Sequence, residues 1–95
     1  MQGANDVFRM SDAGEPSRKK QDASTDTLFG RVLRAVRNRK GLSQDELAHR
    51  AGYSRNYIGL VESGKTSPSL RALFNLAKAL GVRPSLLIRR TEPRE

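Results

Sequence analysis

Apolar side chains recur at helical spacing directly after residue 26, over residues 28–36. They are Leu28, Phe29, Val32, Leu33 and Val36. These positions fall on one face of an α-helix, and arginines occupy much of the remaining surface. The pair Lys40–Gly41 ends the pattern with a residue that tolerates a left-handed turn. The pattern therefore predicts a first amphipathic helix from about residue 26 to residue 40.

A second helix is indicated by its start signal as well as by its apolar face. Ser43 precedes Glu46 by three residues, which is the spacing of a capping box, in which each side chain bonds the backbone amide of the other. Gly52 is suited to end the helix. The expected buried face consists of Leu47, Ala48 and Ala51.

The third predicted helix runs from Ser54, as its N-cap, to Glu62, and the pair Ser63–Gly64 ends it. Gly52 joins it to the second helix through a tight turn, which sets two helices at a steep angle, and the small Ala48 permits their close approach. The third helix is anchored by few apolar residues, Ile58 and Val61 among them. Most of its surface is therefore expected to face outward.

The fourth helix is expected to start with Ser67 as cap and Pro68 at its first position, and to end at Gly81. Its predicted apolar stripe consists of Leu70, Leu73, Phe74, Ala77 and Leu80. A short fifth helix over residues 84–90 carries three adjacent apolar residues, Leu86, Leu87 and Ile88. No strand pattern and no repeat occur, so the expected fold is all-α, with five helices in a compact bundle.

Residues 1–26 lack such periodicity, and we expect them to form a disordered arm. The expected organisation is thus an arm over 1–26, a domain over 27–90 and a tail over 91–95. The arm holds four cations and five carboxylates, whereas the whole chain carries +8, so the remainder carries +9. Such dense positive charge suggests a polyanionic partner, and the alternative is a basic surface that only keeps the protein soluble. The run Arg18–Lys19–Lys20 either contacts phosphate or is solvated.

Several kinds of protein are disfavoured by the composition. The chain has no cysteine, which excludes disulfides and thiolate chemistry, and no run of large apolar residues exceeds three, too short to cross a membrane. The lone His49 has no partner at metal-ligand spacing, and no carboxylate pair with a supporting histidine or glycine-rich phosphate loop is present. We therefore expect a cytoplasmic protein that is not an enzyme and needs no metal, cofactor or small-molecule ligand.

Two residues at the start of the third helix are suited to reading DNA. Arg55 and Asn56 carry the side chains that pair with guanine and adenine edges in a major groove. The alternatives are a solvated arginine and an asparagine that caps its helix. Gly59, in the interior of the same helix, is either tolerated at a cost of about 1 kcal/mol or needed for a close approach to DNA.

The segment LSQDELAHRAGYSRNYIGLVESGKTSPSLRALFNLAKALGV resembles the helix-turn-helix domain of the lambda-repressor-like (XRE/Cro) superfamily of transcription regulators. The resemblance extends over about residues 28–90. The portion SRNYIGLVESG is similar to controller proteins of restriction–modification systems. The resemblance implies a compact five-helix DNA-binding domain in which the helix over 54–62 enters the major groove.

The resemblance also implies roles for single residues. A salt bridge is implied between Arg37 and Glu62, from the first helix to the end of the third. At the sixth position of the recognition helix this chain has Leu60, where many members of the family have a polar residue, so a base contact there would be apolar, against a thymine methyl group, or absent. The base-reading candidates are Arg55, Asn56, Gly59 and Leu60. The phosphate-contact candidates are Gln44, Ser54, Tyr57, Ser63, Lys65 and Thr66.

Two classes of function fit these observations. The first is a homodimeric, sequence-specific regulator of double-stranded DNA that pairs through residues 82–90, with Leu86, Leu87 and Ile88 at the interface. The second is a protein-interaction module of the same fold, of the antitoxin or coactivator type. Such a module should expose an additional apolar face, whereas we expect the five-helix core to use the apolar residues up. The operator, the sign of regulation, the regulated genes, control by a partner and the role of the arm stay open.

Overall fold

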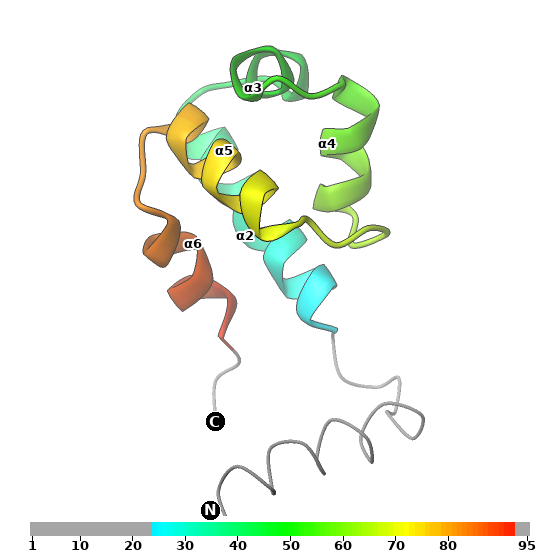
Figure 1. Cartoon of the computed structure of the whole chain (residues 1–95), viewed down its shortest axis with the longest axis vertical. Helices are drawn as coiled ribbons and strands as arrows, with labels where there is room; N and C mark the ends of the chain where they lie inside the picture. Colours follow the sequence, from blue (N-terminus) through cyan, green and yellow to red (C-terminus); the bar gives the residue numbers. More distant parts are fainter. Residues whose placement is uncertain (1–23, 93–95) are drawn as a thin grey trace, which may run out of the picture.

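The computed structural model describes residues 24–92. This part of the chain folds into α-helices without any strand, which confirms the expected all-α class (Figure 1). The helices are α2 (Thr25–Arg39), α3 (Gln44–Ala51), α4 (Arg55–Glu62), α5 (Leu70–Leu80) and α6 (Pro84–Thr91). The predicted arm, up to residue 23, and the tail from residue 93 lie outside the described residues.

Serine hydroxyls cap the N-termini of the first four helices. In α3, the hydroxyl of Ser43 accepts from the amide of Glu46 at 3.0 Å, and the Glu46 carboxylate accepts from the Ser43 amide at 2.8 Å. The expected capping box is therefore confirmed. Gly52 ends α3 at φ 83°, a left-handed conformation that glycine adopts without a Cβ penalty.

Two predicted boundaries were wrong. The N-cap of α2 is Ser24, so the last residues assigned to the arm belong to the folded domain. The N-cap of α5 is Ser69, whose hydroxyl accepts from the amide of Ala72 at 3.0 Å. Serines flank Pro68 on both sides, and the second one provides the cap, so Ser67 and Pro68 lie in the connection before the helix.

A single core forms where the five helices meet. Figure 1 shows α4 and α6 on opposite sides of the bundle, with α2 and α5 between them and α3 across one end. The core consists of Phe29, Leu33, Val36, Leu47, Ala48, Ile58, Val61, Leu73, Leu76, Ala77, Leu80 and Leu87. Ile58 and Val61 are fully buried, which confirms that they anchor α4.

The apolar stripe of α5 differs from the predicted one. Leu70 is 69% exposed and Phe74 is 52% exposed, while Ala72 and Leu76 are buried instead. Leu70 and Phe74 are one turn apart, so together they form an apolar strip at the edge of the buried face. On α6, Leu87 is fully buried in the core. It is not available to a second molecule, which corrects its assignment to a dimer interface.

Gly30 brings α2 directly against the end of α4. A Cβ at this position would meet the backbone carbonyl oxygens of Glu62 and Val61, the latter at 2.5 Å. No larger residue fits without a shift of the two helices. The contact fixes where the last turn of α4 rests on α2, and thereby the placement of α4 in the domain.

Candidate nucleic-acid interface

One face of α4 is presented to the outside. Arg55, Asn56 and Leu60 are exposed, and Gly59 is half-buried between them. These positions lie on the same side of the helix because they are one turn apart. The opposite side carries Ile58, Val61 and Glu62, all buried. The base-reading candidates therefore share one accessible face, as the sequence predicts.

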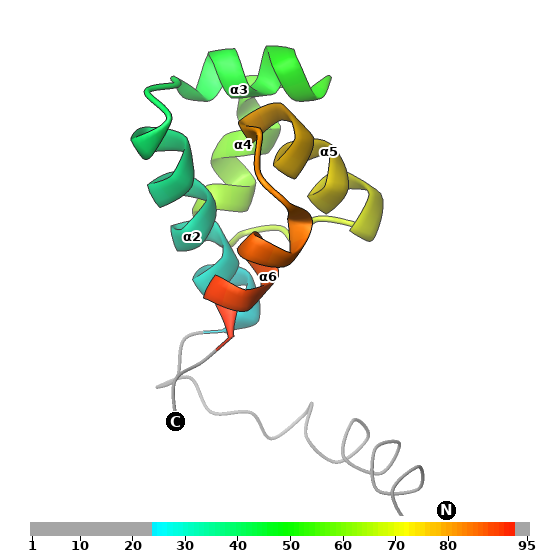
Figure 2. The same cartoon turned by 90° about the vertical axis from the view of Figure 1, so that its left-hand side faces the viewer.

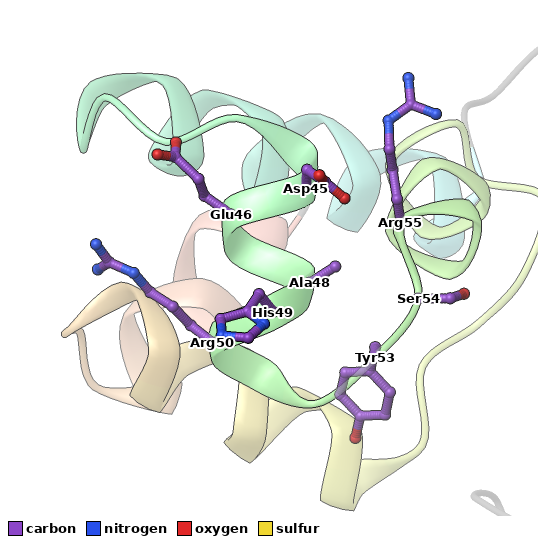
Figure 3. A pocket seen from close by; sticks show the side chains of 8 residues that line it. All are labelled: Asp45, Glu46, Ala48, His49, Arg50, Tyr53, Ser54 and Arg55. Atoms are coloured by element: carbon purple, nitrogen blue, oxygen red, sulfur yellow. The ribbon is translucent and has the colours of Figure 1, made fainter.

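A groove separates this face from α3. It is lined by Asp45, Glu46, Ala48, His49, Arg50, Tyr53, Ser54 and Arg55. In Figure 3, Asp45 and Ala48 point from α3 toward the turn, and the Arg55 side chain extends outward from the first turn of α4. The Ser54 hydroxyl accepts from the Tyr57 amide at 3.0 Å. Ser54 therefore caps α4, and its hydroxyl proton is still available for a further acceptor.

A buried ionic network fixes the far end of α4. Arg37, on α2, donates from Nε to Glu62 Oε2 at 2.6 Å and from a terminal nitrogen to Oε1 at 3.1 Å. Its other terminal nitrogen donates to the Leu42 carbonyl at 2.7 Å. The Glu62 side chain has no exposed surface. The implied salt bridge between the first and third predicted helices is therefore present, and it is a bidentate pair.

Two further side chains donate hydrogen bonds to Glu62. Arg34 donates from Nε to Glu62 Oε1 at 3.3 Å, and Gln44 donates from Nε2 to the same oxygen at 3.0 Å. Burial by itself would raise the pKa of Glu62, but hydrogen bonds from Arg37, Gln44 and Arg34 outweigh it and hold that pKa below its usual range. The carboxylate is therefore charged at neutral pH and joins α2, α3 and α4.

This arrangement gives Gln44 a role that the sequence did not indicate. We expected its side chain to contact phosphate, yet one amide hydrogen is engaged by Glu62. The second amide hydrogen is left for a phosphate. Gln44 therefore links the start of α3 to the end of α4.

The other phosphate-contact candidates lie in different surroundings. Lys65 is exposed and Thr66 is half-buried in the connection after α4. The Ser63 hydroxyl donates to the Leu60 carbonyl at 3.1 Å, so its proton is not available to a phosphate.

Tyr57 is a half-buried candidate. Its ring centroid lies 4.8 Å from that of Tyr53, and burial raises the pKa of its hydroxyl. Its hydroxyl is therefore neutral at physiological pH.

Gly59 has no packing role within the domain. A Cβ there would approach only the Gln44 side-chain nitrogen, at 4.0 Å, an ordinary contact distance, and its backbone does not adopt a positive φ. Alanine would fit and would favour the helix. Nothing inside the described domain requires glycine at this position, which agrees with both alternatives, a tolerated glycine and a close approach to DNA.

Sequence reasoning missed three contributors to this region. Gly30 sets the contact between α2 and α4, Arg34 is a third side chain on Glu62, and Asn75 donates to the Tyr53 hydroxyl at 2.9 Å. A glycine inside a helix pattern signals a close approach of backbones, so Gly30 was detectable. The other two contacts join residues distant in sequence and carry no local signal.

The positive charge of the domain is not concentrated on the reading segment. Residues 44–66 contain three basic residues, Arg50, Arg55 and Lys65, and three carboxylates, Asp45, Glu46 and Glu62. Eight of the other basic residues of the described domain lie between residues 25 and 40 or between residues 83 and 92. The overall charge therefore did not locate the interface.

Two kinds of feature are absent from the described residues. None of the helices between residues 24 and 92 is long and apolar enough to span a membrane. The same residues hold no group of three or more histidine, cysteine or carboxylate side chains placed to bind a metal ion.

A family model for a helix-turn-helix domain matches residues 33–87, more than half of the chain. The chain belongs to the XRE-like helix-turn-helix family. The match includes α3, the turn at Gly52 and α4, which are the parts of the predicted helix-turn-helix. The predicted resemblance is confirmed.

This helix-turn-helix protein is similar to several regulators. Control protein C.SmaI of Serratia marcescens is 44% identical over 63 residues, which cover 65% of this chain and 75% of that protein. The uncharacterised helix-turn-helix transcriptional regulator y4dJ of Sinorhizobium fredii is 40% identical over 55 residues, which cover 58% of this chain and 71% of that protein. The crystal structure of the restriction–modification controller protein C.AhdI from Aeromonas hydrophila superimposes with a TM-score of 0.64 at 44% identity, covering 65% of this chain and 94% of the other.

Proposed function

We propose that this helix-turn-helix regulator binds double-stranded DNA sequence-specifically as a homodimer, with α4 in the major groove. The observation that carries the proposal is the exposed face of α4, held in place by the Glu62 network. A reading helix must keep a fixed angle to the groove for its side chains to meet base edges. The hydrogen bonds of Glu62 to α2 and α3 would hold α4 at that angle.

We assign direct base reading to Arg55 and Asn56. Arg55 occupies the first turn of α4 and is exposed, so its guanidinium can meet O6 and N7 of a guanine together. Asn56 follows it on the same side and has the amide that pairs with adenine. Leu60, 36% exposed, offers an apolar surface for a thymine methyl group.

Close approach of the DNA is a further part of the proposal. Gly59 lies between Asn56 and Leu60 on the exposed face, and no neighbour within the described domain requires it to be glycine. A missing side chain at this point would let the groove wall or a base edge come nearer to the helix backbone. Ser54, Lys65 and the second amide hydrogen of Gln44 would hold phosphates around it.

The exposed apolar strip is the surface we assign to pairing. Leu70 on α5 and Ile88 on α6, which is 47% exposed, line one groove together with Phe29 and Leu73, and Phe74 lies one turn along α5 from Leu70. The sequence had suggested that the core uses up the apolar residues, and this strip corrects that expectation. Two-fold pairing doubles the number of base contacts and sets the recognition helices about 34 Å apart, one turn of DNA.

An interaction module of the same fold would also use such a strip, so the strip alone does not decide between the two functions. The outward face of α4 favours the DNA-binding function, because its polar side chains match the chemistry of base edges. The direct test is selection from a pool of random duplexes. A two-fold symmetric consensus with half-sites about 10 base pairs apart supports the proposal, and no enrichment over repeated rounds contradicts it.

A further inference from the structure

A second charged surface lies on the side of the domain that faces away from the recognition helix. Figure 2 shows α6 nearest the viewer, beside α2, with α4 behind the bundle. Between α2 and α6 is a cleft, here named the α2–α6 cleft. It is lined by Arg31, Val32, Ala35, Val36, Arg89, Arg90 and Glu92.

The cleft combines positive charge with an apolar floor. Arg31 projects from α2, and Arg89 and Arg90 from the last turn of α6, and all three are exposed. Glu92 is the carboxylate among the lining residues, so the arginines are in excess. Within residues 24–92, the ion pairs are those of Glu62 with Arg34 and Arg37, and none involves a cleft arginine. Val32 and Ala35 supply the apolar surface between them.

We propose that the α2–α6 cleft docks an acidic segment of another protein. The carboxylates of such a segment would pair with Arg31, Arg89 and Arg90. The planar guanidinium group of an arginine can donate two parallel hydrogen bonds to one carboxylate, which makes the pair bidentate. An apolar side chain of the segment would pack on Val32 and Ala35. Complementary charge of this kind fixes orientation and speeds encounter.

A protein segment fits the cleft better than a nucleic acid does. Because α4 and α6 lie on opposite sides of the bundle (Figures 1 and 2), a duplex held by α4 would approach from the side away from α6. Backbone recognition relies on several phosphate contacts spread along the duplex, whereas the cleft concentrates three arginines around apolar side chains. Phosphates gain nothing from that floor. Because DNA reading leaves the cleft free, docking there is compatible with the proposed function and does not depend on it.

The proposal is tested by titrating the full chain with a short peptide in which glutamate alternates with leucine, followed by amide chemical shifts. A second peptide, with glutamine in place of each glutamate, is the control for apolar binding. We expect saturable shifts centred on Arg31, Ala35 and Arg89 with the glutamate peptide. We expect them to weaken as salt rises, since exposed charges are screened.

Charge reversal identifies the residues responsible. The double variant Arg31→Glu with Arg89→Glu should bind the peptide at least about tenfold more weakly. Its melting temperature should stay unchanged because both side chains are exposed, and its operator affinity should be kept because neither residue belongs to the exposed face of α4 or to the apolar strip. The matched control carries Arg71→Glu with Lys78→Glu, two exposed positions on α5, and should bind the peptide as the unmodified chain does.

Three outcomes would overturn the proposal. Equal binding of the glutamine peptide would show that charge is not recognised. Shifts centred on α3 and α4, or unchanged binding by the Arg31→Glu, Arg89→Glu variant, would locate the contact elsewhere. Stronger perturbation of the cleft by a random duplex than by the peptide would make it a nucleic-acid surface. Operator binding is measured separately, so failure here is distinguishable from failure of the proposed DNA reading.

Discussion

The carboxylate of Glu62 joins α4 to α2 and α3. It is fully buried and accepts hydrogen bonds from Arg34, Arg37 and Gln44. Removing one partner of a buried pair leaves the other charge uncompensated, which costs about 3–5 kcal/mol. We therefore expect Glu62→Ala to lower the free energy of unfolding by about that amount in a urea titration, with Glu46→Ala, at an exposed carboxylate, as the milder control.

The same carboxylate predicts how stability depends on pH. The pKa of Glu62 is lower in the folded protein than its usual value, which is about 4.3 in an unfolded chain. Its contribution is complete above that value and is lost as pH falls through the folded pKa. The melting temperature should drop below about pH 4. The melting temperature should drop less steeply in the Glu62→Gln variant. An equally steep drop in that variant would show that the acid sensitivity does not come from Glu62.

Gly59 allows stability and binding to be separated at one position. The space around it accepts a Cβ, and alanine in a helix interior is favoured over glycine by about 0.5–1 kcal/mol. We expect Gly59→Ala to raise the melting temperature while it weakens operator binding, because the new methyl group meets the DNA. Thermal melting and fluorescence anisotropy on the same preparation measure both. Undiminished affinity in the stabilised variant would show that Gly59 makes no close approach.

At the scale of helices, the contact between α2 and α4 depends on Gly30. An added methyl group would press on the carbonyl oxygens of Val61 and Glu62, and overpacking of this kind costs about 1–3 kcal/mol. Gly30→Ala should therefore destabilise the domain, the opposite of Gly59→Ala, although both replace a glycine inside a helix. Urea unfolding of the two variants side by side tests this. A stabilised Gly30→Ala protein would mean that the helices are not in close contact.

The helices themselves were predictable wherever a local signal marks them. The box of Ser43 with Glu46 and the turn at Gly52 involve residues close in sequence, and both were located correctly. The start of α5 was misplaced because Pro68 has a serine on each side, and either one is a plausible cap. The apolar face of α5 was misjudged because Leu70 and Phe74 are apolar yet exposed, and hydrophobicity alone does not tell a core position from an exposed one.

The sequence predicted which residues lie in the candidate site better than it predicted the contacts between them. The exposure of Arg55 and Asn56 and the pair of Arg37 with Glu62 agree with the roles that the resemblance implies. The participation of Arg34 and Gln44 was not foreseen. Three donors from α2 and α3 meet at the carboxylate of Glu62 on α4. Such a meeting of side chains depends on the packing of the whole domain.

At the scale of the whole molecule, pairing is the property that remains to be measured. Phe74→Glu places a charge in the exposed apolar strip, where it would be buried against a second copy at high cost. We expect this variant to sediment as a monomer at concentrations where the unmodified chain is a dimer, with an unchanged melting temperature, since Phe74 is half exposed. Arg39→Glu, exposed in the last turn of α2 and outside the strip, is the control.

Leu87 is unsuitable for that experiment. Its side chain is fully buried, so a glutamate there would unfold the domain whether or not the protein pairs. A dimeric Phe74→Glu variant would show that the interface lies elsewhere.

We propose that α4 reads bases while the segment after it holds the DNA backbone, and two positive residues, Arg55 and Lys65, test this division of roles together. Arg55→Ala should cost about 1–3 kcal/mol on the preferred operator and relax the preference at one base position. Lys65→Ala should weaken all sequences nearly equally and make the salt dependence shallower by about one unit. The measurement is the affinity of both variants for a panel of single-base operator changes at several salt concentrations. If Arg55→Ala instead weakens every operator alike, Arg55 contacts phosphate, and the account of base reading by the first turn of α4 is wrong.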